Sequence, residues 1–229
     1  MTATPPGTPG PGTPRPRKTG SRAAARLLAE RDPVVAGLVA EFGLPSFPAP
    51  DGTPFEALVR SITYQQLAGA AARAIHGRLI ALLDGEVTPE RLASATDQQL
   101  RQAGMSGSKT RSLHDLAGRV LDGTVVIEPR RLARLSDTDI VTRLSAVYGI
   151  GRWSAEMFLM FHLRRLDIWP VGDLAVRRGF AAAWDIPVPA PKQLDALGEP
   201  YHPYRSIVAW YCWRAAQRYA GSAASAVTA

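Results

Sequence analysis

Two glycines in the second half of the sequence separate two segments whose apolar residues have helical spacing. The first segment ends near Val147, the second begins near Arg152, and Gly149-Ile150-Gly151 lies between them. A turn this short needs a positive φ angle or a close approach of two backbones, and glycine permits both because it has no Cβ atom. The sequence therefore predicts a tight helical hairpin, which is the most constrained local feature of the chain.

The glycines also expose the amides at the start of the second helix of this hairpin. Helix N-terminal N–H groups and the helix dipole attract anions, and a DNA phosphate is one such anion. An ordinary helical hairpin with a glycine turn would show the same three residues. The continuation favours a functional site, because Trp153 and Met157 share a face of the second helix, Pro170 ends the pattern and Asp173 opens another helix.

The charge balance of the chain favours a polyanionic partner. Lys and Arg exceed Asp and Glu by seven over 229 residues, and the hydrophobic fraction is 46%. This length allows one large domain or two small lobes with a sizeable core. No apolar run approaches the length of a membrane span. Nucleic acid is favoured over a membrane surface because no strongly basic amphipathic helix stands out. A positive charge that serves only solubility is the alternative.

Cysteine use excludes several kinds of site. The single cysteine, Cys212, cannot form an intramolecular disulfide, a four-cysteine iron–sulfur cluster or a thiolate zinc site. The histidines and carboxylates show no metal-ligand spacing, so we expect no required cofactor. The first twenty residues contain no apolar core segment of a signal peptide, and we expect a cytoplasmic protein.

The N-terminal segment, residues 1–20, consists largely of proline, glycine and threonine with a late basic cluster. It has too few apolar groups to offset the entropy cost of ordering, which predicts a disordered basic tail. Beyond it the pattern is all-α, and Thr53, Thr88 and Thr96 are predicted helix caps. One β-like run, residues 124–127, is too isolated to form a sheet. The expected helices cover about residues 22–31, 34–42, 55–63, 68–83, 89–93, 97–103, 109–121, 130–134, 137–144, 152 onward, 174–183, 191–197 and 203–220.

Three motifs together resemble a known family. The run Gly149-Ile150-Gly151-Arg152-Trp153-Ser154-Ala155, followed by Asp173 just past a proline, resembles the helix-hairpin-helix DNA glycosylases. Within that group the chain is most similar to the alkylbase (3-methyladenine type II) branch. Residues 55–67 and Pro203-Tyr204-Arg205-Ser206, with Trp213 downstream, agree with this resemblance. It covers about residues 22–219, nearly everything except the tail.

The resemblance implies a particular all-α architecture. Two helical lobes would flank a cleft, and the helix-hairpin-helix motif and Asp173 would lie at that cleft. The central lobe would cover about residues 55–171, and the second lobe would combine residues 21–54 with residues 172–229. Double-stranded DNA containing damaged bases is the implied partner, and a monomer is the expected form.

Asp173 matches the catalytic aspartate of the family. An ionised carboxylate at a helix start can stabilise the oxocarbenium-like sugar that forms as a base departs. It could also orient or deprotonate the attacking water, as carboxylates do in glycoside hydrolysis. Asp before an apolar helix is also an ordinary N-cap, and that is the alternative interpretation.

Trp153 stands where bifunctional members of the family carry a lysine. An amine can attack the sugar as a Schiff-base nucleophile and an indole cannot, so the resemblance implies a monofunctional enzyme. Trp153 and Trp213 suit a pocket for a cationic alkylated purine, through stacking and cation–π attraction. Met157 and Tyr64 would line the same pocket. For Trp213, plain core packing is an equally good interpretation.

The remaining expected contacts are with the DNA backbone and the base stack. The hairpin would bind phosphate through Gly149, Gly151, Arg152 and Ser154, and Lys109 in a glycine-rich turn could add a further contact. An ordinary loop is an equal alternative for Lys109.

By the family pattern, a wedge that fills the gap left by the extruded nucleotide comes from residues 64–67. We expect Gln66 to be this wedge, with Leu67 second and a helix-capping amide as the alternative. Relatives also bind a monovalent cation at the hairpin through backbone carbonyls, which would be those of Ser145, Val147 and Ile150.

The expected function is therefore that of a monofunctional DNA glycosylase. It would hydrolyse the N-glycosidic bond of alkylated purines such as 3-methyladenine in base excision repair. Two alternatives stay open. One is a helix-hairpin-helix protein that recognises DNA damage without chemistry, and the other is a glycosylase for deaminated or oxidised bases.

Overall fold

The computed structural model describes residues 19–219, and every regular element in that range is helical. It contains thirteen α-helices, one π-helical segment and one short 3-10 helix. The β-like run at residues 124–127 is a loop, and the all-α prediction is confirmed. Residues 1–18 of the predicted tail lie outside the described residues. None of the helices described is long and apolar enough to cross a membrane.

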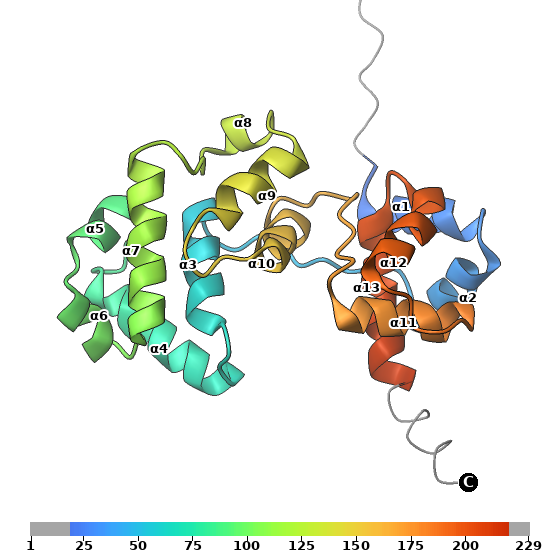
Figure 1. Ribbon diagram of the computed structural model, residues 1–229, viewed down its shortest axis with the longest axis horizontal. Helices are drawn as coiled ribbons and strands as arrows, with labels where there is room; N and C mark the ends of the chain where they lie inside the picture. The colour runs from blue at the N-terminus through green and yellow to red at the C-terminus, as the bar shows by residue number, and fades with distance from the viewer. Residues whose placement is uncertain (1–18, 220–229) are drawn as a thin grey trace, which may run out of the picture.

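Figure 1 shows two groups of helices. The central lobe contains α3 to α10, and α7 is the longest of these helices, with α3, α5 and α6 packed against it. Its core includes the fully buried side chains of Leu113, Leu116 and Ala117. The helices of this lobe are α3 (Pro54–Tyr64), α4 (Gly69–Leu82), α5 (Pro89–Ser94), α6 (Asp97–Gln102), α7 (Gly107–Leu121), α8 (Pro129–Leu132), α9 (Asp137–Ser145) and α10 (Arg152–Met157), which continues as the π-helical segment Phe158–His162.

The second lobe joins helices from both ends of the chain. It contains α1 (Ser21–Ala29), α2 (Pro33–Phe42), α11 (Leu174–Trp184), α12 (Pro191–Leu197) and α13 (Arg205–Tyr219). Helices α11 and α13 approach closely at Gly179, where an added Cβ would overlap the backbone of Cys212. Cys212 itself is fully buried, as expected of a small apolar side chain.

Local sequence signals account for several helix starts. Thr53 and Thr96 both form capping boxes, with Glu56 and Gln99 as the respective partners. Thr88 accepts a hydrogen bond from the Arg91 amide. Such caps satisfy backbone amides that have no partner inside the helix.

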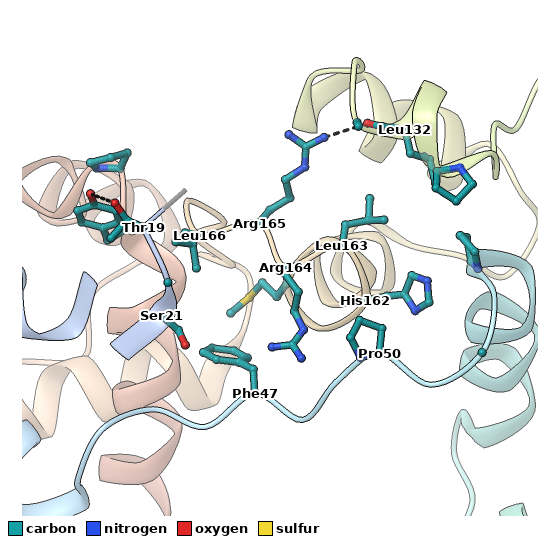
Figure 2. Close-up of a pocket in the computed structure, with 18 residues that line it drawn as sticks. Thr19, Ser21, Phe47, Pro50, Leu132, His162, Leu163, Arg164, Arg165 and Leu166 are labelled. Atoms are coloured by element: carbon teal, nitrogen blue, oxygen red, sulfur yellow. Dashed lines mark hydrogen bonds between the residues drawn. The ribbon is translucent and has the colours of Figure 1, made fainter. Parts of the chain in front are cut away.

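Two extended stretches, residues 43–53 and 163–173, connect the lobes. Between them and the neighbouring helices lies a cavity of about 910 Å³, whose lining includes Phe47, His162 and Tyr204. Figure 2 shows Arg164 beside Phe47 and Arg165 reaching toward Leu132, whose carbonyl accepts a hydrogen bond from it at 2.9 Å. The second stretch leads from the π-helical segment directly to the start of α11, which brings Asp173 to the junction of the two lobes.

Candidate active site at the junction of the lobes

Asp173 is the N-cap of α11 and accepts four hydrogen bonds. Its Oδ1 accepts from the backbone amides of Ala175 at 2.7 Å and Val176 at 3.1 Å. Its Oδ2 accepts from the indole Nε1 of Trp153 at 2.8 Å and of Trp213 at 3.2 Å. All four neighbours are donors, the arrangement that suits an acceptor-only carboxylate. Asp173 is therefore the helix cap that the sequence indicated, through its Oδ1. Its Oδ2 faces the two tryptophans and is not used in capping.

The two tryptophans reach Asp173 from different lobes. Trp153 belongs to the first turn of α10 in the central lobe, and Trp213 belongs to α13 in the second lobe. Trp153 is 53% exposed, whereas Trp213 is partly buried against the core. The structure therefore brings together Asp173, Trp153 and Trp213, and it leaves the ring of Trp153 accessible to a ligand.

A row of aromatic rings continues from Trp213. The centroid of the Phe161 ring lies 5.9 Å from that of Trp213, and the Phe47 ring lies 5.8 Å from Phe161. Phe161 is 41% exposed. Our sequence reasoning missed both phenylalanines. Phe161 lies in the π-helical segment, where α-helical spacing no longer gives the correct face, and Phe47 lies in a proline-rich loop without periodicity.

Met157 and Tyr64 have other surroundings. Met157 is partly buried against the core. The Tyr64 ring lies edge-on to His76 at 5.8 Å, with the Arg60 guanidinium 5.3 Å from its centroid. Among the described residues, no hydrogen bond or ring contact joins Tyr64 to Asp173 or the two tryptophans, so its role in a base pocket stays a prediction.

A second carboxyl group lies near Asp173. Glu156 on α10 has a 6% exposed side chain and accepts a hydrogen bond from Arg152 Nε at 2.8 Å. Burial raises the pKa of Glu156, Arg152 lowers it, and the negative charge of Asp173 raises it further. The predicted DNA contact Arg152 is thus paired with an acid inside the protein. The signal in the sequence was an acidic residue four positions after an arginine in an otherwise apolar helix.

In the hairpin between α9 and α10, residues 146–151, Gly149 has the geometry expected of a turn glycine and Gly151 does not. Gly149 has a φ of +79°, and an added Cβ would overlap the Ser112 hydroxyl of α7. Gly151 has an ordinary φ of −87°, and nothing lies within 4 Å of an added Cβ. The space beside Gly151 is open to a ligand at the point where the first amides of α10 have no intrahelical partner. Ser154, in the same first turn, is partly buried.

Helix α7 and the end of α3 hold this hairpin in place. Asp115 Oδ2 accepts the Tyr148 amide at 2.7 Å, and the Arg111 guanidinium lies 3.9 Å from the centroid of the Tyr148 ring. The side-chain amide of Gln65 donates to the Gly149 carbonyl at 3.0 Å. The sequence placed Gln65 in the wedge segment 64–67 without a role of its own and indicated nothing for Asp115, because bonds to backbone atoms far along the chain leave no local pattern.

The predicted wedge loop, residues 64–67, follows α3. Gln66 has a φ of +56°, an uncommon conformation for a residue with a Cβ atom, and it is exposed. Leu67 is 37% exposed. Lys109 is engaged by the same region, because its ammonium donates to the Thr63 carbonyl at 2.7 Å and burial lowers its pKa. Its predicted phosphate contact is not tested by this arrangement.

The carbonyls predicted to bind a monovalent cation occupy the end of α9 and the hairpin. Val147 O accepts the Ile150 amide at 3.1 Å, and no protein donor to the Ser145 or Ile150 carbonyl is recorded among the described residues. The Ser145 and Ile150 carbonyls are thus available as cation ligands, and the Val147 carbonyl keeps a second lone pair, so the three residues fit such a group. In the described part of the chain, no group of three or more His, Cys, Asp or Glu side chains could hold a metal ion.

Asp32, at the start of α2, repeats the bonding pattern of Asp173. Its Oδ1 accepts from the amides of Val34 and Val35. Its Oδ2 accepts from the Tyr201 hydroxyl at 2.6 Å and the Trp184 indole at 3.4 Å. Tyr201 is only 6% exposed and Trp184 is partly buried, so both aromatic donors to this second carboxylate pack within the second lobe. Asp32 is therefore a natural structural control for Asp173.

Comparison with known proteins assigns the fold to a family. The pattern of the HhH-GPD superfamily base excision DNA repair proteins matches residues 59–202. DNA-3-methyladenine glycosylase 1 of Schizosaccharomyces pombe is 34% identical over 164 residues, which cover 70% of this chain and 72% of that protein.

Solved structures agree with this assignment. The DNA-3-methyladenine glycosidase of Bacillus halodurans matches with a TM-score of 0.78 at 32% identity, over 86% of this chain and 91% of that one. The Schizosaccharomyces pombe 3-methyladenine DNA glycosylase in complex with abasic DNA matches with a TM-score of 0.70 at 32% identity, over 83% of this chain and 95% of that one. The chain therefore belongs to the HhH-GPD superfamily of base excision DNA repair proteins, in its 3-methyladenine DNA glycosylase branch.

Proposed function

We propose that this protein is a DNA glycosylase that hydrolyses the N-glycosidic bond of alkylated purines such as 3-methyladenine in base excision repair. The observation that carries the proposal is the carboxylate of Asp173, fixed by four donors beside the exposed Trp153 ring and close to the hairpin. The relatives named 3-methyladenine glycosylases, and the relative crystallised with abasic DNA, support the same assignment.

The proposed reaction begins with extrusion of the damaged nucleotide from the duplex. The hairpin amides bind the DNA backbone, and the lesion leaves the base stack to reach the exposed ring of Trp153. An alkylated purine such as 3-methyladenine carries a positive charge, so it is attracted to the electron-rich faces of aromatic rings. Trp153, Phe161 and Trp213 supply such faces next to Asp173.

Asp173 then stabilises the positive charge that develops on the sugar as the base departs. Its donors hold the carboxylate in place before the reaction, so little reorganisation is needed in the transition state. The two oxygens have about four lone-pair directions, and the four hydrogen bonds occupy them. A water molecule that Asp173 is to deprotonate has to displace one of these donors. The geometry thus favours electrostatic stabilisation over general-base catalysis.

The proposal includes the absence of lyase activity. Trp153 occupies the position of the lysine in bifunctional relatives, and an indole cannot form a Schiff base. Two of the lysines lie in the described residues. Lys109 donates to the Thr63 carbonyl and Lys192 lies in the first turn of α12. Neither has a recorded contact with Asp173.

We further propose that the protein acts as a monomer on double-stranded DNA. A monovalent cation at the Ser145, Val147 and Ile150 carbonyls would neutralise part of the phosphate charge at the hairpin. Cytoplasmic localisation stays a prediction.

Base release from alkylated duplex DNA tests the proposal, with Asp173→Asn as the decisive variant. Asparagine keeps the shape and can keep the cap through its Oδ1, but it loses the charge and the oxygen that accepts from the two indoles, so single-turnover release should fall by about 10²–10³-fold. Duplex affinity should hold, because the carboxylate contributes nothing to phosphate binding. Asp32→Asn is the matched control, since it removes the same charge from the same bonding pattern and should leave the rate within a few-fold of wild type.

Other outcomes identify the alternatives. Retardation of DNA without any base release would indicate a protein that only binds damage. Release from duplexes with deaminated or oxidised bases, and not from alkylated ones, would indicate a different specificity. A single-turnover rate of base release within a few-fold of wild type for the Asp173→Asn variant would show that Asp173 is only a helix cap.

A further inference from the structure

The wedge loop and the hairpin are joined by a direct hydrogen bond, although they lie far apart in the sequence. Gln65 Nε2 donates to the Gly149 carbonyl at 3.0 Å across a separation of 84 residues. Gly149 is the hairpin residue with a positive φ and no room for a Cβ, so its carbonyl has a fixed position. The side chain of Gln65 therefore ends on the most constrained point of the hairpin.

The backbone around Gln65 is also constrained. Gln65 ends α3, and the next residue, Gln66, has a φ of +56°. Residues with a Cβ adopt this conformation only at an energetic cost, so surrounding contacts have to hold it. Lys109 of α7 provides one such contact by donating to the Thr63 carbonyl at 2.7 Å. The hydrogen bond from Gln65 to the Gly149 carbonyl of the hairpin provides a second contact.

We propose that Gln65 is a positioning residue that fixes the wedge loop to the hairpin, so that the phosphate bound at the hairpin sets where residues 66–67 enter the base stack. The inference rests on the proposed function and deepens it. Gln66 and Leu67 would be the groups that touch the DNA, whereas Gln65 acts through them. Nucleotide extrusion, rather than DNA affinity or bond cleavage, is the step that depends on it.

The expected size of the effect follows from the loss of one hydrogen bond. Such a bond contributes modestly, and its loss corresponds to a roughly three- to tenfold change in an equilibrium. Gln65→Met is the sharpest variant, because methionine has nearly the same length and shape but no N–H group. Gln102→Met, at the exposed end of α6, is the matched control for the same substitution away from the hairpin.

The primary experiment measures single-turnover base release on two duplexes. One carries a paired alkylated base, and the other carries the same lesion opposite an abasic site, where extrusion needs less energy. For Gln65→Met we expect release from the paired lesion to fall about three- to tenfold and to recover on the second duplex. Binding to undamaged duplex should stay within twofold of wild type, as should both rates for Gln102→Met.

A double-mutant cycle separates positioning from direct contact. If Gln65 acts through the wedge, Gln65→Met should add little to the defect of Gln66→Ala. Additive losses in the double variant would show that Gln65 contacts DNA independently, which contradicts the proposal. Three other results would contradict the proposal. They are an equal loss of release rate on both duplexes, a parallel loss of affinity for undamaged DNA, and an unchanged release rate.

Fluorescence of 2-aminopurine placed next to the lesion reports extrusion without requiring bond cleavage. Weaker fluorescence with Gln65→Met than with wild type supports the positioning role, and equal fluorescence overturns it. This measurement stays informative if wild-type protein releases no base from alkylated DNA. In that case the proposed function fails, while the role of Gln65 is still decided.

Discussion

At the scale of single residues, Asp32 and Asp173 show how little a hydrogen-bond pattern says about function by itself. Each caps a helix with one oxygen and accepts from two aromatic side chains with the other. They differ in what surrounds the donors. The donors to Asp32 include Tyr201, at 6% exposure, whereas the donors to Asp173 include Trp153, at 53% exposure beside the hairpin. Of the four aromatic donors only Trp153 is exposed, so an approaching nucleotide can contact an aromatic ring beside the carboxylate only in the second arrangement.

Trp153 also carries a prediction about the products. Without an amine at this position, the enzyme should release bases and leave intact strands with abasic sites that break only in alkali or heat. Borohydride added during turnover should trap no covalent enzyme–DNA adduct. An adduct that accumulates as fast as free base appears would show that another group, such as Lys109, reaches the sugar.

At the scale of elements, the hairpin depends on two glycines for different reasons, and Gly151 permits a clean test. Its φ is ordinary and the space beside it is open, so Gly151→Val should fold without strain in the protein. The valine side chain would instead occupy the space needed by a phosphate. Affinity for damaged and undamaged duplex should fall together, by about tenfold or more if one charge-assisted phosphate contact is lost.

A filter-binding or gel-shift titration at low salt, with thermal melting alongside, separates this effect from unfolding. If the affinity of Gly151→Val for both duplexes were unchanged, the hairpin would not be part of the DNA-binding surface. Gly149→Val is not an equivalent variant, because it would overlap Ser112 and distort the hairpin itself.

Helix α10 carries a buried acid whose ionisation should cost stability. The folded pKa of Glu156 is raised, mainly by burial, so ionisation is less favourable in the folded state than in the unfolded chain. This penalty is absent below the unfolded pKa of about 4.3, grows as pH rises through the folded pKa, and is complete above it.

Glu156→Gln should therefore raise the melting temperature at pH 7 and leave it nearly unchanged near pH 3.5. Glutamine can still accept the Arg152 hydrogen bond, but the guanidinium charge is no longer neutralised, so duplex affinity should also rise. Glu90→Gln on α5 is the control for loss of an exposed acid. A lower melting temperature at pH 7 would show that the Arg152 ion pair outweighs the burial of Glu156.

The elements themselves were predictable from the sequence to a large extent. The helices, the caps at Thr53, Thr88 and Thr96, and the need for glycine at position 149 depend on local sequence, and the structure confirms them. The same need was wrongly expected at Gly151, whose φ is ordinary. Local spacing failed at the π-helical segment Phe158–His162, because one extra residue per turn changes the face on which Phe161 lies.

The site was predictable only in part. Asp173 and the two tryptophans could be named from motifs, but their mutual hydrogen bonds depend on how α10, α11 and α13 meet. The bond from Gln65 to a backbone carbonyl 84 residues away has no signature in either segment, because any residue can supply a carbonyl.

At the scale of the whole molecule, the second lobe is held by contacts between the two ends of the described chain. The Tyr211 hydroxyl donates to the Gly43 carbonyl at 2.9 Å, across 168 residues, and the Tyr211 side chain is fully buried. Tyr211→Phe leaves that carbonyl without its donor and should lower the free energy of unfolding by about 1–2 kcal/mol. Denaturant titration measures the loss, and single-turnover base release at low temperature should remain at the wild-type value.

If Tyr211→Phe left stability unchanged, the link between α13 and residue 43 would contribute nothing to the lobe. A large loss of base release with unchanged stability would place Tyr211 in the reaction instead. Burial raises the pKa of its hydroxyl to about 12, so the group stays protonated over the working pH range and its bond should not titrate there.

The junction between the lobes has a consequence for the order in which activity appears during synthesis. The hairpin belongs to a continuous run of helices that leaves the ribosome before α13, so a growing chain can present a DNA-binding surface early. Trp213 and the helices that complete the second lobe emerge last, and until then α1 and α2 lack the partner that covers their apolar faces. A chain interrupted before α13 should therefore bind DNA without excising a base. Until α13 is added, the exposed apolar faces of α1 and α2 should make the chain dependent on chaperones.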